Sequence, residues 1–227
     1  MAETLPLFPL STVLLPGASL PLHIFEPRYR QLVVDLVTGT VPGREFGVVA
    51  IRQGWEVGED NVESLHQVGC SAVLVTATPL PDGRFDVLSR GSRRFRLLDI
   101  DDSSAPYLIG AVEWLADVDP PADRQETLPL LVEAARTAHR RYRELVREHR
   151  ERPVDLPEDV APGALAHLLA ADCLLSESDR LQVLEENCPV RRLNLVRRLL
   201  NREAALLHAL RAVPAPVSAF AELPSRN

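Results

Sequence analysis

The chain has 227 residues, of which 46% are hydrophobic and 25% are charged. This is ordinary for one large folded domain or two small ones. No apolar run reaches the roughly 18 residues of a membrane span, and the N-terminus lacks a basic segment followed by an apolar one. We therefore expect a cytoplasmic protein without a membrane partner. The net charge of −7 argues against nucleic acid as a general partner.

All 25 basic residues are arginines, because the sequence contains no lysine. A Walker A loop needs its lysine to contact nucleotide phosphates, and a Ser-Lys dyad needs lysine as the base. Neither site can be built from these residues. We expect a protein that is not an enzyme.

The cysteines and histidines show no pattern of a catalytic or metal site. Cys70, Cys173 and Cys188 are widely spaced without a Cys-x-x-Cys pair, as is typical of buried thiols in a reducing compartment. None of the six histidines lies close in sequence to a recognisable nucleophile motif, and no pair has metal-ligand spacing. We expect no metal and no cofactor, while a small-molecule hydrolase whose triad assembles in space remains an alternative.

The stretch Leu5 to Leu32 mixes prolines with apolar residues. Prolines restrict it to short extended pieces that turn sharply, and its apolar content predicts that it lies under other parts of the protein. Pro27 is suited to a first helical turn, and apolar residues at helical spacing predict a helix that ends near Gly39.

The segment from Phe46 to Trp114 has the pattern of β-strands, with a hairpin turn at Asp82-Gly83. Together with the N-terminal extended pieces it gives six or seven strands, enough to close into a small barrel. The strands predicted within it are Phe46–Ile51, Val68–Thr78, Phe85–Ser89, Arg93–Ile100 and Tyr107–Leu115.

A change of composition at Asp117–Gln125 predicts a boundary, after which the pattern becomes helical. We predict a β subdomain over residues 1–117, a helical bundle over 118–212 and a proline-containing tail over 213–227, either disordered or docked as an extended strand. We expect the apolar stripe of the first long helix to pack against the β half. Four helices are predicted: Leu128 to His149, Pro162 to Leu174, one capped by Ser176 and Asp179, and Pro189 to Leu210.

Several blocks of sequence carry a resemblance to a known family. They are PLFPL, VLLPG and LHIFEPRY in the N-terminal stretch, followed by FGVVAIRQGWEVG, VGCSAVL and DGRFDVLSRGSRRFRLL. In this order they resemble the Lon protease N-terminal domain, also called the LON substrate-binding domain, and the similarity extends to about Leu210. The resemblance implies an α+β fold, in which a PUA-like pseudo-barrel with one early helix precedes a four-helix bundle. It also implies binding of unfolded or extended polypeptide.

In full-length Lon proteases this domain precedes an ATPase and a protease module. A separate ATPase or protease is therefore an expected partner, and the chain is expected to act as an adaptor or a chaperone-like protein. An RNA-binding module is the second alternative, because PUA-like barrels bind RNA and the sequence RGSRRFR is basic. No aromatic residues are interleaved with these arginines as stacking platforms, which argues against nucleic-acid binding.

Two groups of residues are candidate functional positions. Within the family signature, Glu26, Pro27, Arg28 and Tyr29 are interpreted as structural: Pro27 starts the helix, Tyr29 packs and Arg28 pairs with a carboxylate. For polypeptide binding we predict an aromatic anchor beside guanidinium donors, formed by Trp55, Arg93, Arg94 and Arg96. A lid over the barrel core is the alternative for Trp55, and a solvated surface with local ion pairs is the alternative for the arginines.

Overall fold

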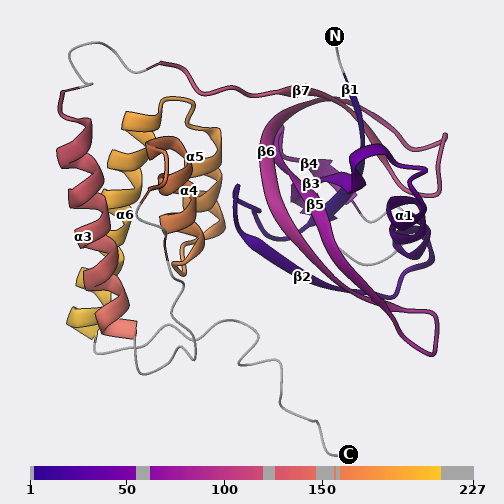
Figure 1. Cartoon of the computed structure of the whole chain (residues 1–227), viewed down its shortest axis with the longest axis horizontal. Helices are drawn as coiled ribbons and strands as arrows, with labels where there is room; N and C mark the ends of the chain where they lie inside the picture. The colour runs from indigo at the N-terminus through magenta and orange to yellow at the C-terminus, as the bar shows by residue number, and fades with distance from the viewer. Residues whose placement is uncertain (1–2, 55–61, 120–125, 147–155, 157–158, 211–227) are drawn as a thin grey trace, which may run out of the picture.

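A ring of strands and a group of helices lie side by side in the computed structural model of the chain (Figure 1). The structure describes residues 3–54, 62–119, 126–146, 156 and 159–210. Within these ranges the order of elements confirms the predicted α+β class, with strands and one early helix first and four helices after them. No helix in the described part of the chain is both long enough and apolar enough to cross a membrane.

The strands form one closed, mostly antiparallel sheet, which confirms the predicted pseudo-barrel. Antiparallel neighbours follow the order β1-β7-β6-β5-β3, and a parallel pairing of Leu7–Leu10 in β1 with Gly47–Ala50 in β3 closes the ring. β2 pairs with β6 and β4 with β3 at the margins. The strands are β1 Glu3–Leu10, β2 Ser19–Ile24, β3 Glu45–Gly54, β4 Val62–Leu65, β5 Val68–Pro79, β6 Phe85–Asp101 and β7 Ile109–Trp114.

β6 differs from the prediction, because Phe85–Ser89 and Arg93–Ile100 belong to one strand of 17 residues. Its seventh residue, Gly91, has no side chain, so the loop between β1 and β2 can approach it closely. The Gly91 amide donates to the carbonyl of Ala18 and its carbonyl accepts from the amide of Gly17, both at 2.8 Å. These bonds hold the strand against the loop in the stretch between the two predicted strands. The short strand β4 was not predicted.

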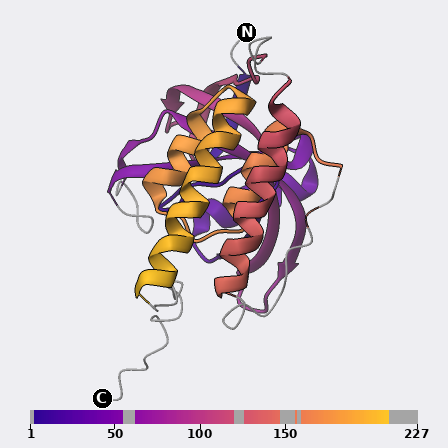
Figure 2. The ribbon, with the colours of Figure 1, turned by 90° about the vertical axis from the view of Figure 1, so that its left-hand side faces the viewer.

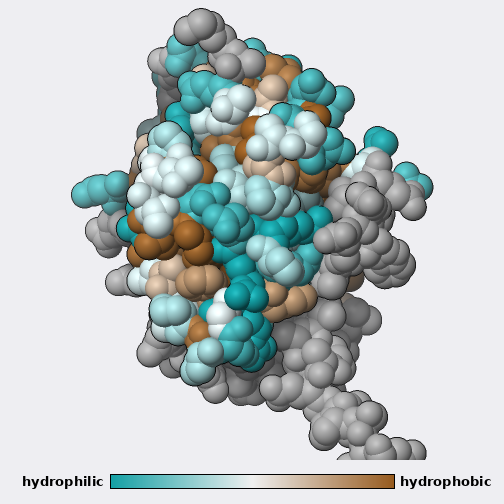
Figure 3. Space-filling view, turned by 90° about the vertical axis from the view of Figure 1, so that its right-hand side faces the viewer, coloured by the Kyte–Doolittle hydropathy of each residue, from teal (hydrophilic) through white to brown (hydrophobic). Residues whose placement is uncertain are grey.

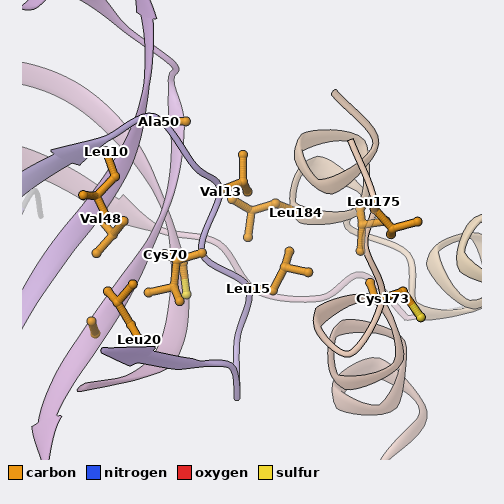
Figure 4. Close-up of a cluster of buried hydrophobic side chains, with 14 of the residues drawn as sticks. Leu10, Val13, Leu15, Leu20, Val48, Ala50, Cys70, Cys173, Leu175 and Leu184 are labelled. Atoms are coloured by element: carbon orange, nitrogen blue, oxygen red, sulfur yellow. The ribbon is translucent and has the colours of Figure 1, made fainter. Parts of the chain in front are cut away.

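The loop between β1 and β2 fills the space between the ring and the helices. Val13, Leu14 and Leu15 are all buried, and Figure 4 shows Val13 and Leu15 between strand residues on one side and Leu184 and Cys173 on the other. The hydrophobic core is therefore continuous from the ring into the helices. The expectation that this stretch lies under other parts of the protein is confirmed.

The early helix α1 (Pro27–Thr38) begins and ends where the sequence predicts. Pro27 occupies its first turn, and Gly39 follows it with the left-handed φ of 84° that glycine tolerates. A short 3₁₀ helix, η1 (Pro42–Arg44), leads into β3. On the face of the molecule that carries α1, hydrophobic residues lie in separate patches among hydrophilic ones (Figure 3).

The four C-terminal helices are arranged differently from the prediction in one respect. The apolar stripe of α3 packs mainly against α6, with α4 also in contact, whereas α5 contacts β5 of the ring. Figure 2 shows α3 and α6 together on the side of the molecule away from the ring. The expected cap of α5 is confirmed, since Ser176 Oγ accepts from the Asp179 amide at 3.1 Å. The helices are α3 Leu128–Val146, α4 Pro162–Ala171, α5 Glu177–Glu185 and α6 Pro189–Leu210.

Candidate functional site

A buried ionic network joins the ring to the helices. Arg94 of β6 is 4% exposed and Arg192 of α6 is 0% exposed, and both guanidinium groups donate to the carboxylate of Asp117, which follows β7. Arg94 Nη1 also donates to the carbonyls of Leu184 at 2.8 Å and Glu186 at 3.2 Å. Burial lowers the pKa of both arginines, and the charge of Asp117 counteracts this effect. The network fixes the segment after β7 against α5 and α6.

Asp117 also lies against the first turn of α4. A Cβ atom placed on Gly163 would be only 2.5 Å from Asp117 Oδ2, so an alanine at this position would require the Asp117 carboxylate to shift. Ala161, the residue just before the helix, provides no side-chain cap. The carboxylate therefore lies where the N-terminal end of a helix dipole favours negative charge.

His167 of α4 completes this network as a neutral side chain. Its Nε2 atom lies 3.3 Å from Arg192 Nη1. Burial, followed by the positive charges of Arg192 and Arg94, holds the pKa of His167 well below its ordinary value of 6.5. The folded protein therefore keeps this imidazole uncharged under conditions in which the unfolded chain protonates it.

We expect the free energy of unfolding to decrease as the pH falls below about 6.5. The unfolded chain then binds a proton at His167 that the folded chain does not, at a cost of at most about 1.4 kcal/mol per pH unit. Urea unfolding of the wild type and of His167→Gln at pH 7.5 and 5.5 measures this effect. The pH dependence should be weaker in the variant. Equal pH dependence in the wild type and His167→Gln would contradict the assignment.

Two neighbouring hollows open on the ring, and the second of them lies next to the Asp117 network. The first, which we call the outer groove, has a volume of about 720 Å³ and runs between the start of β1, the segment before β3 and the end of β7. The second, the junction hollow, has a volume of about 400 Å³ and lies between β6, the segment after β7 and the helices α4 and α6. Arg93 and Trp114 line both, so their side chains form the wall that the two hollows share.

Arg93 and Trp114 form a cation–π pair in this shared wall. The guanidinium carbon of Arg93 lies 3.6 Å from the centre of the indole ring, and Phe95 supports the indole from the ring interior in an edge-on contact at 6.2 Å. Arg93 Nη2 also donates to Glu45 Oε2 at 2.9 Å. The Arg93 side chain is 52% exposed, so this aromatic and guanidinium pair is accessible from solvent.

Two polar atoms beside Arg93 lack hydrogen bonds. Among the described residues, Trp114 Nε1 and Glu45 Oε1 are buried without a partner. Leaving buried polar groups unpaired costs about 1–3 kcal/mol each. One is a donor and the other an acceptor, which are the two kinds of group that a peptide carbonyl and a peptide amide pair with.

The structure separates the residues that the sequence predicted as a binding site. Trp55 lies outside the described residues. Arg93 faces the two hollows, Arg94 is buried in the Asp117 network, and Arg96 lies outside the lining of both hollows, 3.9 Å from Glu113. Sequence reasoning did not identify Trp114 as the aromatic partner of Arg93. The available signal was the pairing of two predicted strands, which places Trp114 opposite Phe95, the second residue after Arg93.

The family-signature residues support the junction between β2 and α1. Arg28 pairs with Glu26 at 2.9 Å, Pro27 occupies the first turn of α1, and the buried Tyr29 stacks on Phe8 with ring centres 4.0 Å apart. These contacts agree with a structural interpretation of the four residues. Of the four, Glu26 and Tyr29 line a small hollow of about 130 Å³.

Arginines on the long helix make local ion pairs. Arg140 pairs with Glu133 at 2.7 Å, and Arg143 lies 3.4 Å from the buried Asp172, which also contacts His139 at 2.8 Å.

Burial raises the pKa of the Cys70 thiol to about 12, so it is not a thiolate near neutral pH. Within the described residues, no three His, Cys, Asp or Glu side chains gather as a metal site requires.

Comparison with curated sequences identifies proteases that contain a similar segment. The chain is 30% identical over 205 residues to the Lon protease of Anaeromyxobacter dehalogenans, covering 89% of this chain and 24% of the protease. It is 24% identical over 217 residues to the Lon protease of Cytophaga hutchinsonii, covering 93% of this chain and 26% of the protease. The chain thus spans about a quarter of the length of these relatives.

Solved structures and a family profile also relate the chain to the N-terminal part of Lon proteases. A Lon N-terminal domain protein from Xanthomonas campestris superposes with a TM-score of 0.57 at 26% identity, covering 93% of this chain and 99% of that one. The N-terminal domain of the Lon protease of the Mycobacterium avium complex has the same fold, with a TM-score of 0.59 at 16% identity, covering 89% of this chain and 98% of that one. The profile of the ATP-dependent protease La (LON) substrate-binding domain matches residues 4–202. The chain therefore belongs to the Lon substrate-binding domain family.

Proposed function

We propose that the chain is a non-enzymatic module that binds unfolded or extended polypeptide in the outer groove. The observation that carries this proposal is the exposed Arg93–Trp114 pair, next to a buried donor and a buried acceptor that lack partners. The family assignment supports it, since the family is described as a substrate-binding domain. The absence of lysine supports a role without ATP hydrolysis or Ser-Lys proteolysis.

The groove suits an extended chain for two reasons. Its walls combine apolar surface from Pro6, Ile109 and Trp114 with the polar side chains of Glu45 and Arg93. A small rotation of Arg93, which contacts both Trp114 and Glu45, would open Trp114 Nε1 and Glu45 Oε1 to a backbone amide and carbonyl. Backbone recognition of this kind binds many sequences, while shallow apolar pockets add preference. We infer that the protein acts as an adaptor or a chaperone-like protein that presents polypeptide to a separate ATPase or protease.

Replacing Arg93 by Ala should weaken binding of an unfolded polypeptide about tenfold, the effect of a modest interface hot spot. Reduced and carbamidomethylated α-lactalbumin is a suitable probe, with affinity measured by fluorescence anisotropy. The free energy of unfolding should fall by about 1 kcal/mol, because the Arg93 side chain is 52% exposed while its partner Glu45 is 16% exposed and loses the ion pair.

Arg90 provides the matched control for this variant. It is an exposed arginine on the same strand and is absent from the lining of both hollows. Arg90→Ala should bind the probe with wild-type affinity. Equal weakening by both variants would mean that only general positive charge matters, and unchanged affinity in Arg93→Ala would place the binding surface elsewhere.

A further inference from the structure

The junction hollow continues from the outer groove toward the helices. Arg93 and Trp114 border both spaces. A chain that lies in the outer groove can therefore reach the junction hollow by passing over this pair. The residues beyond the pair determine which chemical group can end there.

The charges that line the junction hollow are mainly positive. Arg93, Arg94 and Arg192 contribute three guanidinium groups, and Asp117 contributes one carboxylate. Arg93 has its own acid partner in Glu45 on the outer groove side, which leaves Arg94 and Arg192 to share Asp117. Glu186, whose charge also acts on these two arginines, is itself paired with Arg191 at 3.1 Å. One further negative charge would balance this set.

Hydrogen-bond donors for an anion are present in the same place. Arg192 is 0% exposed, and its Nε atom has no acceptor among the described residues. Gly163 and Ala164, in the first turn of α4, also line the hollow, and amides at this position of a helix have no partner within the helix.

We propose that the junction hollow binds a carboxylate of the polypeptide held in the outer groove, either its C-terminal carboxylate or an acidic side chain near its end. The inference rests on the proposed function and adds a chemical preference to it. An arginine–carboxylate contact is charge-assisted and stronger than a neutral hydrogen bond. The preference would select acidic segments or free chain ends among the many sequences that the groove accepts.

Three synthetic peptides test this proposal. They share one unstructured sequence of Ser, Ala, Val and Leu, and carry a C-terminal amide, a free C-terminal carboxylate, or a C-terminal amide with one Glu in the last three residues. The chain contains two tryptophans, so Trp55→Phe leaves Trp114 as the fluorescent reporter at the hollow. We expect at least one carboxylate peptide to bind about tenfold more tightly than the neutral amide. Which of the two gains affinity identifies the source of the carboxylate.

Arg93→Gln should remove this advantage, whereas Arg90→Gln should keep it. Three peptides of equal affinity, in a protein that binds unfolded α-lactalbumin, would overturn the carboxylate inference and leave the proposed function standing. If neither the peptides nor unfolded α-lactalbumin bind, the proposed function fails and the inference fails with it. The carboxylate peptides could also keep their higher affinity in Arg93→Gln and lose it at 0.5 M NaCl. That result would indicate nonspecific attraction and would overturn the carboxylate inference.

Discussion

Asp117→Asn should lower the free energy of unfolding by about 3–5 kcal/mol, the loss typical when one partner of a buried ion pair is removed. The substitution leaves Arg94 and Arg192 buried without a negative partner. Because the Asp117 side chain is 37% exposed, water compensates in part and the lower end of this range is expected. Urea unfolding at pH 7.5 measures the change.

Asp119→Asn is the matched control, because Asp119 is exposed on the same segment two residues further along. It should change the free energy of unfolding by less than about 0.5 kcal/mol.

Gly163→Ala provides an independent variant. Alanine normally stabilises a helix relative to glycine by about 1 kcal/mol, but here its Cβ would meet Asp117 Oδ2 at 2.5 Å. A stabilised Gly163→Ala protein would contradict the described position of the Asp117 carboxylate.

Gly91→Ala should be the second strongly destabilising substitution, with a loss of about 3 kcal/mol. The new Cβ would lie 2.3 Å from the carbonyl oxygen of Leu15, which is backbone and cannot rotate away as a side chain could. The loop between β1 and β2 would have to move, and it carries the buried residues Val13 and Leu15 into the core between ring and helices. Differential scanning calorimetry or urea unfolding measures the loss.

Ser89→Ala on the same strand controls for the effect of substitution in β6. Ser89 is buried, and its hydroxyl has no hydrogen-bond partner among the described residues. Removing it should therefore be neutral or slightly stabilising. If Gly91→Ala were as stable as Ser89→Ala, the loop would not be held against β6 as described.

The sequence predicts the features that depend on neighbouring residues. Pro27 and Gly39 define the ends of α1 because proline fits a first turn and glycine accepts a left-handed φ. Ser176 predicts its own helix start through a hydrogen bond three residues away. The turn at Asp82-Gly83 is equally local, with Gly83 at a φ of 79°. For this reason the α+β class and most element boundaries follow from the sequence.

The candidate site depends on contacts that are distant in sequence, and therefore much of it was not predicted. Arg192 and Asp117 are 75 residues apart, and no local pattern relates them. Trp114 meets Arg93 because of the register between β6 and β7, which shifts between Leu97 and Asp99. The sequence analysis predicted an aromatic anchor beside the arginines near position 93 and named Trp55 for it, whereas the tryptophan that the structure places against Arg93 is Trp114.

The Trp114 indole signal in a ¹H–¹⁵N NMR spectrum offers the most direct test of polypeptide binding in the outer groove. The chain has two tryptophans, and Trp55→Phe assigns the two indole signals. Adding unfolded α-lactalbumin should shift the Trp114 signal downfield, because an N–H without an acceptor gains one, and should shift backbone amides of Thr40–Glu45 and Ile109–Trp114. Arg93→Ala should reduce these shifts at equal concentration. Binding that leaves the Trp114 signal and the groove amides unchanged, while signals elsewhere move, would contradict the proposed site.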